Sequence, residues 1–144
     1  MNNNTHHRLT EGTRFYCYCE QCVEGSVTIK TVLDDEGKIL LIDRHVECSK
    51  TVLGKSLMYN FSLGLQHYHP DLNRLTYVIR ACSAHYNFHY HRWLYTHPAM
   101  NRGIVEGGRP LNSILESHGA YHEALDYVSA NFYERIEEWL AKKS

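Results

Sequence analysis

Five cysteines and eleven histidines give this 144-residue chain an unusual supply of side chains that bind metals. The stretch FYCYCEQC places three cysteines within six positions, and Cys19 and Cys22 form a C-x-x-C pair. This spacing lets two thiolates bind one ion from a tight turn. His45 and Cys48 form a second pair with the same spacing, H-x-x-C. Clustered cysteines in a reducing compartment favour metal binding over disulfide bonds.

The segment between the two pairs reads as a β-hairpin. SVTIKTVL and KILLID are strand-like, and DDEG between them is typical of a turn, in which Gly37 supplies a positive φ. A hairpin of this length returns the chain to its start, so the two pairs can meet. We therefore predict one zinc ion bound by Cys19, Cys22, His45 and Cys48. Cys17 is an alternative to His45, because Cys17 and Cys19 share one face if the chain is extended there.

CEQC and HVEC, arranged as two knuckles around a hairpin, resemble a zinc ribbon. The resemblance covers residues 19–48 and departs from the usual pattern at His45, where cysteine is more common. It implies a structural zinc ion with all four coordination positions filled and none open for a substrate.

From about residue 50 the pattern changes to the period of helices. Apolar residues recur at helical spacing between residues 52 and 93, and again between residues 111 and 140. Pro70 and Asp71 suit the first turn of a long helix. We expect an α+β protein: a flexible arm over residues 1–13, a zinc ribbon-like module over 14–49, and a small helical bundle over 50–144. The module and the bundle are expected to form one unit.

Histidines on the predicted helices offer a second kind of site. Cys82, His85 and His89 would share one face of the long helix, and His118 with His122 one face of the last helix. If these faces met, the imidazoles could bind a catalytic metal, as in a hydrolase or nuclease. The alternative is that they pack in the core, and we expect this structural role.

Arginine and tyrosine would line the opposite face of the long helix and continue into a glycine-rich loop. Such side chains can pair with phosphates and stack on bases, or dominate contacts with a protein partner. The candidate binding residues are Arg74, Tyr77, Arg80, Arg92, Arg102 and Arg109.

Charge and composition restrict the functional class. The net charge of −1 argues against a strong non-specific nucleic-acid binder. The N-terminal residues lack an apolar signal region, and no apolar run reaches membrane-spanning length, so we expect a cytoplasmic protein without a membrane partner. The sequence predicts a non-enzymatic, zinc-containing binding protein or regulator that acts on a protein or a nucleic acid. Homo-oligomers are compatible with this prediction.

Overall fold

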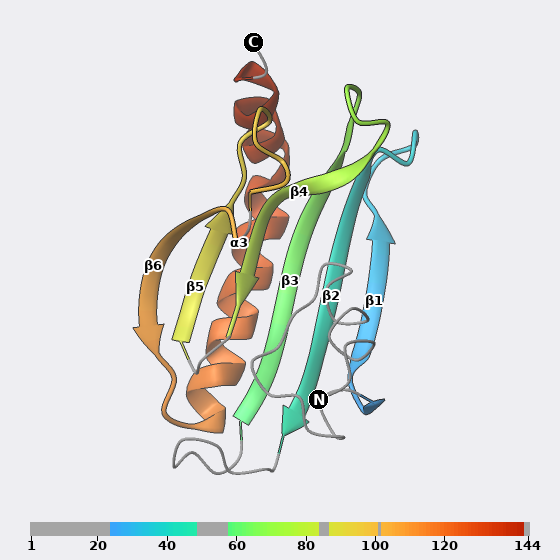
Figure 1. Ribbon diagram of the computed structural model, residues 1–144. Helices are drawn as coiled ribbons and strands as arrows, with labels where there is room; N and C mark the ends of the chain where they lie inside the picture. Colours follow the sequence, from blue (N-terminus) through green and yellow to red (C-terminus); the bar gives the residue numbers. More distant parts are fainter. Residues whose placement is uncertain (1–23, 49–57, 84–86, 101, 143–144) are drawn as a thin grey trace.

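A computed structural model of the chain describes residues 24–48, 58–83, 87–100 and 102–142. Within them, six antiparallel strands form one open sheet in sequence order, followed by one long helix (Figure 1). The elements are β1 (Val27–Val32), β2 (Ile39–Cys48), β3 (Met58–His69), β4 (Arg74–Cys82), β5 (Asn87–Arg92), β6 (Ile104–Pro110) and α3 (Ile114–Ala141). The protein is therefore α+β, as the sequence predicts.

Strands β1 and β2 form the predicted hairpin. Gly37 has a φ of 72° in the connecting turn, a conformation that glycine adopts without steric cost. The Asp34 carboxylate accepts a hydrogen bond of 2.9 Å from the Ile39 backbone N–H and closes the turn. Strand β2 continues the sheet by pairing with β3 over its whole length, from Ile39 opposite His67 to Cys48 opposite Met58. The hairpin and the later strands therefore belong to one sheet.

The predicted helices are wrong between Met58 and Arg92, where the chain forms β3 to β5, and the predicted glycine-rich loop contains β6. The cause lies in burial on both faces of the sheet: all five residues from Phe61 to Leu65 are buried. A strand buried on both faces loses the alternation of apolar and polar residues that identifies strands in a sequence. Pro70 and Asp71 belong to the turn between β3 and β4 rather than to a helix start.

Helix α3 confirms the prediction of a C-terminal helix. Its N-cap is Ser113, whose hydroxyl accepts a hydrogen bond of 3.1 Å from the Glu116 backbone N–H. Small residues let the helix approach the sheet closely, since Ala120 and Ala124 are fully buried. Among the described residues, no helix is both long and apolar enough to cross a membrane.

Helix α3 covers one face of the sheet, which we call the helix face. Phe61 contacts Tyr121, and Tyr90 contacts Tyr127, so the odd-numbered residues of β3 and the even-numbered residues of β5 point toward the helix. The intervening residues of both strands point away from α3, onto what we call the distal face. Ser62 and His89 lie on this distal face and are also buried.

Candidate metal centre

The distal face brings together one thiol and two imidazoles from β4 and β5. Cys82 lies directly opposite His89 in the sheet, and Arg80, two residues before Cys82 on β4, lies opposite His91. His89 and His91 are two positions apart on one strand, so their side chains point to the same face. The two-residue spacing on β5 and the pairing of Cys82 with His89 across the strands thus place the three side chains in one group.

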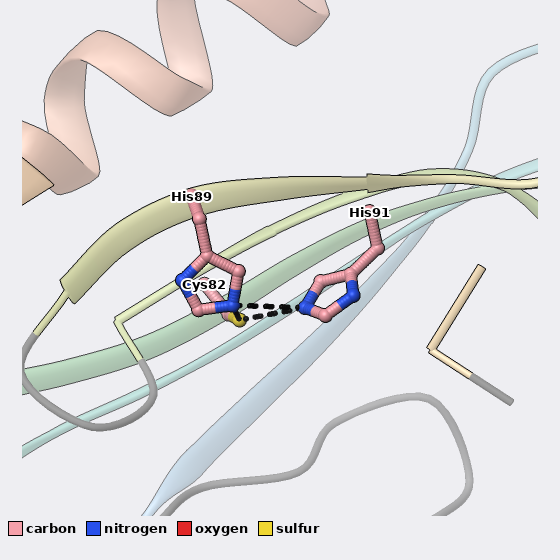
Figure 2. A group of neighbouring side chains, drawn as sticks. All are labelled: Cys82, His89 and His91. Carbon is pink, nitrogen blue, oxygen red and sulfur yellow. Dashed lines mark hydrogen bonds between the residues drawn. The ribbon is translucent and has the colours of Figure 1, made fainter. Parts of the chain in front are cut away.

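The three potential ligand atoms converge on one point (Figure 2). Cys82 Sγ lies 3.2 Å from His89 Nε2 and 3.4 Å from His91 Nε2. The two Nε2 atoms are 3.0 Å apart. All three residues are buried, with 1% of Cys82, 7% of His89 and 2% of His91 exposed. Burial from water strengthens the interaction of such donor atoms with a cation.

Backbone carbonyls determine which nitrogen of each imidazole carries the proton. His89 Nδ1 lies 2.8 Å from the Asn87 carbonyl oxygen, and His91 Nδ1 lies 2.6 Å from the Arg102 carbonyl oxygen. A carbonyl oxygen can only accept, so each Nδ1 donates its hydrogen. In the neutral imidazoles both Nε2 atoms are then unprotonated and direct lone pairs toward Cys82. This orientation, with Nδ1–H bound to a carbonyl, is typical of histidines that bind metals.

The surroundings of His91 favour its neutral form. Burial, followed by the positive charge of Arg80, lowers the pKa of His91 to about 4. The Arg80 guanidinium lies over the rings of Tyr77 and Trp93, at 5.8 and 5.5 Å from their centres. Trp93 in turn stacks on His91 at 5.9 Å. A neutral imidazole is the form that binds metal ions.

A cation between the three ligand atoms would relieve the repulsion within this group. Two neutral imidazoles with bare Nε2 atoms repel each other at 3.0 Å, and the Cys82 thiol has one hydrogen to give. A metal ion would satisfy all three atoms. Tetrahedral zinc with ordinary bond lengths separates two nitrogen ligands by about 3.3 Å and nitrogen from sulfur by about 3.6 Å. The observed separations need to open by only a few tenths of an ångström.

The predicted zinc ribbon-like site is described only in part. Cys17, Cys19 and Cys22 lie outside the described residues, and their role stays a prediction. His45 and Cys48 both belong to the continuous strand β2, and residues three apart in a strand point to opposite faces. His45 lies on the helix face, where its Nδ1 is 3.1 Å from Asp43 and its ring stacks on Tyr59. These two residues therefore do not form a knuckle around one ion in this sheet.

The alternative catalytic group of histidines is not brought together. His85 lies outside the described residues, and His89 points away from α3. His118 and His122 are on α3, where His118 stacks on Tyr59 at 4.0 Å and lies 3.3 Å from Glu47. His122 is exposed beside Tyr121. The sheet separates His89 from both helical histidines.

The predicted arginine and tyrosine surface is also not one face. Arg92 is paired with Glu106 at 2.8 Å, and Arg109 with Glu123 at 2.8 Å. Tyr77 and Arg80 pack together on the distal face, whereas Arg74 and Arg102 are exposed in or near turns. The helix that was expected to carry Arg74, Tyr77, Arg80 and Arg92 is the pair of strands β4 and β5.

His91 is the ligand that sequence reasoning missed. Helical spacing groups Cys82 and His89 with His85 and leaves His91 out of the group. The signal was present in the stretch NFHYHR, where an H-x-H spacing puts both imidazoles on one side of a strand.

Comparisons with protein-family models, with curated proteins and with solved structures find no match to this chain. The donor atoms, their distances and their burial identify Cys82, His89 and His91 as a candidate metal centre.

Proposed function

We propose that this protein binds one transition-metal ion, with zinc the best candidate, through Cys82 Sγ, His89 Nε2 and His91 Nε2. One observation carries the proposal: both imidazoles give their Nδ1 hydrogens to carbonyls and direct bare Nε2 atoms at the same thiol. Mixed thiolate and imidazole ligands suit zinc, and tetrahedral coordination fits their separations.

The role that fits this site best is structural. The ion would join the neighbouring strands β4 and β5 and would hold the Arg102 turn through His91. Metal binding requires the thiolate form of Cys82, and a bound cation stabilises that form.

The broader function follows the sequence prediction of a non-enzymatic binding protein. Its partner, a protein or a nucleic acid, stays a prediction. The alternative hydrolase loses support because His89 is separated from His118 and His122 by the sheet.

Metal titration of the full chain tests the proposal. Metal-free protein is loaded with zinc or cobalt(II), and bound metal is counted by elemental analysis after gel filtration. We expect cobalt to give the absorption of a thiolate-bound tetrahedral ion. His91→Gln should weaken binding by about a hundredfold or more, beyond the usual effect of losing a partner of a ligand. His97→Gln, at an exposed position hydrogen-bonded to Thr96, is the matched control.

The same titration separates this site from the predicted zinc ribbon-like site. Loss of one ion in Cys82→Ser, with a second ion lost only in Cys19→Ser, would mean that both sites exist. Binding that is unchanged in both Cys82→Ser and His91→Gln would overturn the proposal.

A further inference from the structure

The two edge strands of the sheet differ in how well they are protected against pairing with another chain. Strand β6 carries features that hinder such pairing: its register shifts between Phe88 and Tyr90, Gly107 has a φ of 73°, and it ends at Pro110, which lacks an N–H. Strand β1 has a regular register and contains neither glycine nor proline, and five of its six residues are β-branched. Of the two edges, β1 is therefore the one suited to accept another strand.

Apolar side chains of β1 are open to solvent on the helix face. Val27 and Ile29 are 50% and 49% exposed, and both point to the helix face because they lie opposite His45 and Asp43 of β2. Helix α3 reaches β2, where the Tyr121 hydroxyl donates to Asp43, but β1 lies beyond it at the edge of the sheet (Figure 1). The helix face thus ends in an apolar border that α3 does not cover.

Every second residue of β1 directs its backbone N–H and C=O groups out of the sheet. Directly after β1, the Leu33 N–H donates to the Ile39 carbonyl oxygen at 2.9 Å. Hydrogen-bonded pairs alternate along an antiparallel ladder, so the odd-numbered residues of β1 bond to β2. The even-numbered residues, Thr28, Lys30 and Val32, therefore direct their backbone groups outward, where the described sheet ends.

We propose that two copies of this chain form a dimer by antiparallel pairing of their β1 strands, about a twofold axis perpendicular to the sheet. Such an axis joins helix face to helix face, so odd-numbered residues lie opposite odd-numbered ones. Two registers then pair most of the strand, one centred on Ile29 and one on Lys30. The register centred on Lys30 would put two ammonium groups directly opposite each other, which is unfavourable. In the register centred on Ile29, Thr28 exchanges backbone hydrogen bonds with the partner's Lys30.

A second copy fits this edge better than an unrelated strand, because the register centred on Ile29 is self-complementary. Ile29 lies opposite the partner's Ile29, and Val27 lies opposite the partner's Thr31, so the apolar border of each copy covers that of the other. The strand is short, and an interface below the roughly 1,200 Å² of standard complexes gives a weak dimer. The metal centre lies on β4 and β5, so the dimer does not depend on it.

Sedimentation velocity of the full chain, with a reducing agent present, tests the proposal from about 10 µM to about 1 mM protein, the range suited to a weak dimer. We expect a monomer at the lower end and a dimer at the upper end. Ile29→Lys places two ammonium groups opposite each other and should raise the dissociation constant about tenfold or more. Val105→Lys is the matched control, because Val105 is 48% exposed on the other edge strand, β6. Its dissociation constant should be unchanged.

Charge pairing and amide exchange test the register. Ile29→Glu alone should also be monomeric, but an equimolar mixture of Ile29→Glu and Ile29→Lys should dimerise, because opposite charges then face each other across the axis. In the unchanged protein, the Thr28 and Lys30 amides should exchange more slowly in concentrated than in dilute solution. The Ile29 amide should change little, because it is already bonded to β2.

A chain that stays monomeric at the highest concentration would overturn the proposal. So would a dimer whose dissociation constant is unchanged in Ile29→Lys, or one that is lost in Val105→Lys. Slow exchange of the Thr28 and Lys30 amides in the monomer would mean that another segment of the chain covers this edge, and would also overturn it.

Discussion

At the residue scale, the candidate metal centre depends on the environment of Arg80. Its side chain lies between Tyr77 and Trp93, and its charge acts together with burial to keep His91 neutral. Tyr77 is close to the backbone of Gly64, where an added Cβ would lie 2.5 Å from the tyrosine ring. Only glycine at position 64 leaves room for this aromatic support of Arg80.

Tyr77 gives a prediction for alkaline stability. Burial raises the pKa of Tyr77 from 10.0 to about 12. Between these two pH values the unfolded chain loses a proton that the folded chain keeps. The free energy of unfolding therefore falls as pH rises, by up to about 1.4 kcal/mol per pH unit. Tyr77→Phe should make this fall shallower in urea unfolding measured from pH 9 to 11.5. If the free energy of unfolding of the variant fell with pH as steeply as that of the unchanged protein, the raised pKa of Tyr77 would be contradicted.

At the scale of elements, the turn before β6 supplies the backbone carbonyl that accepts the hydrogen bond from His91 Nδ1. Arg102 and Gly103 both have positive φ, 66° and 60°, and the Arg102 carbonyl accepts from His91 Nδ1. A Cβ at Gly103 would lie 2.6 Å from the Arg92 carbonyl oxygen and 2.9 Å from the Trp93 ring. The turn can reach His91 only because residue 103 has no side chain.

Gly103→Ala should therefore weaken zinc binding as well as folding. Displacing the Arg102 carbonyl should cost about 10–100-fold in metal affinity, the usual effect of losing a partner of a ligand. Gly107→Ala is the matched control, because Gly107 also has a positive φ, 73°, but open space around its Cβ position. Both variants should lose stability through backbone strain. Equal zinc affinities in the two variants, measured by competition with a chelator, would contradict this account.

A buried carboxylate joins α3 to the sheet. Asp43 on β2 is 9% exposed and accepts a hydrogen bond from the Tyr121 hydroxyl on α3. Tyr121→Phe leaves the carboxylate with fewer donors and should reduce the free energy of unfolding by about 1–3 kcal/mol. Tyr133→Phe on the exposed side of the same helix should change it by less than about 0.5 kcal/mol. Similar losses in both variants, measured by urea unfolding, would argue against this link.

The sequence predicted elements well where one face of the element meets water. The β1–β2 hairpin shows its turn residues plainly, and the apolar stripe of α3 includes the buried Val128 and Ile136. Prediction from the sequence failed for β3 to β5, because burial on both faces removes the alternation of apolar and polar residues. In β4 a bulge opposite Leu65 and Gln66 disrupts the alternation further.

The same error explains how much of the site could be predicted. Cys82 and His89 were recognised as a pair of potential ligands, but a helical period joined them to His85 instead of His91. Pairing between strands, which places Cys82 opposite His89, depends on register. Register is set by the turn that joins two strands and by which side chains are buried, and both signals are lost when the stretch is read as a helix.

For the whole molecule, the sheet is covered unevenly. Strand β1 is an edge strand with every residue exposed, including Val27, Ile29 and Val32 at about half. Strand β3 lies inside the sheet and carries Phe61, Leu63 and Leu65, each 0% exposed. Edge strands open at low free energy, whereas central strands open only with the whole fold.

Hydrogen exchange should follow this gradient. Amides of β3 should exchange most slowly, and amides of the two edge strands, β1 and β6, should exchange fastest among the described strands. Zinc should slow exchange in β4 and β5, because the ligands lie on these strands. Zinc-dependent protection confined to β1 and β2 would instead favour the predicted zinc ribbon-like site and contradict the centre at Cys82.

Anomalous diffraction at the zinc absorption edge, from crystals of the zinc-loaded full chain, tests the central claim most directly. The account predicts one peak about 2.3 Å from Cys82 Sγ and about 2.0–2.1 Å from the Nε2 atoms of His89 and His91. Protein that has bound zinc but shows no peak between these three side chains would contradict it.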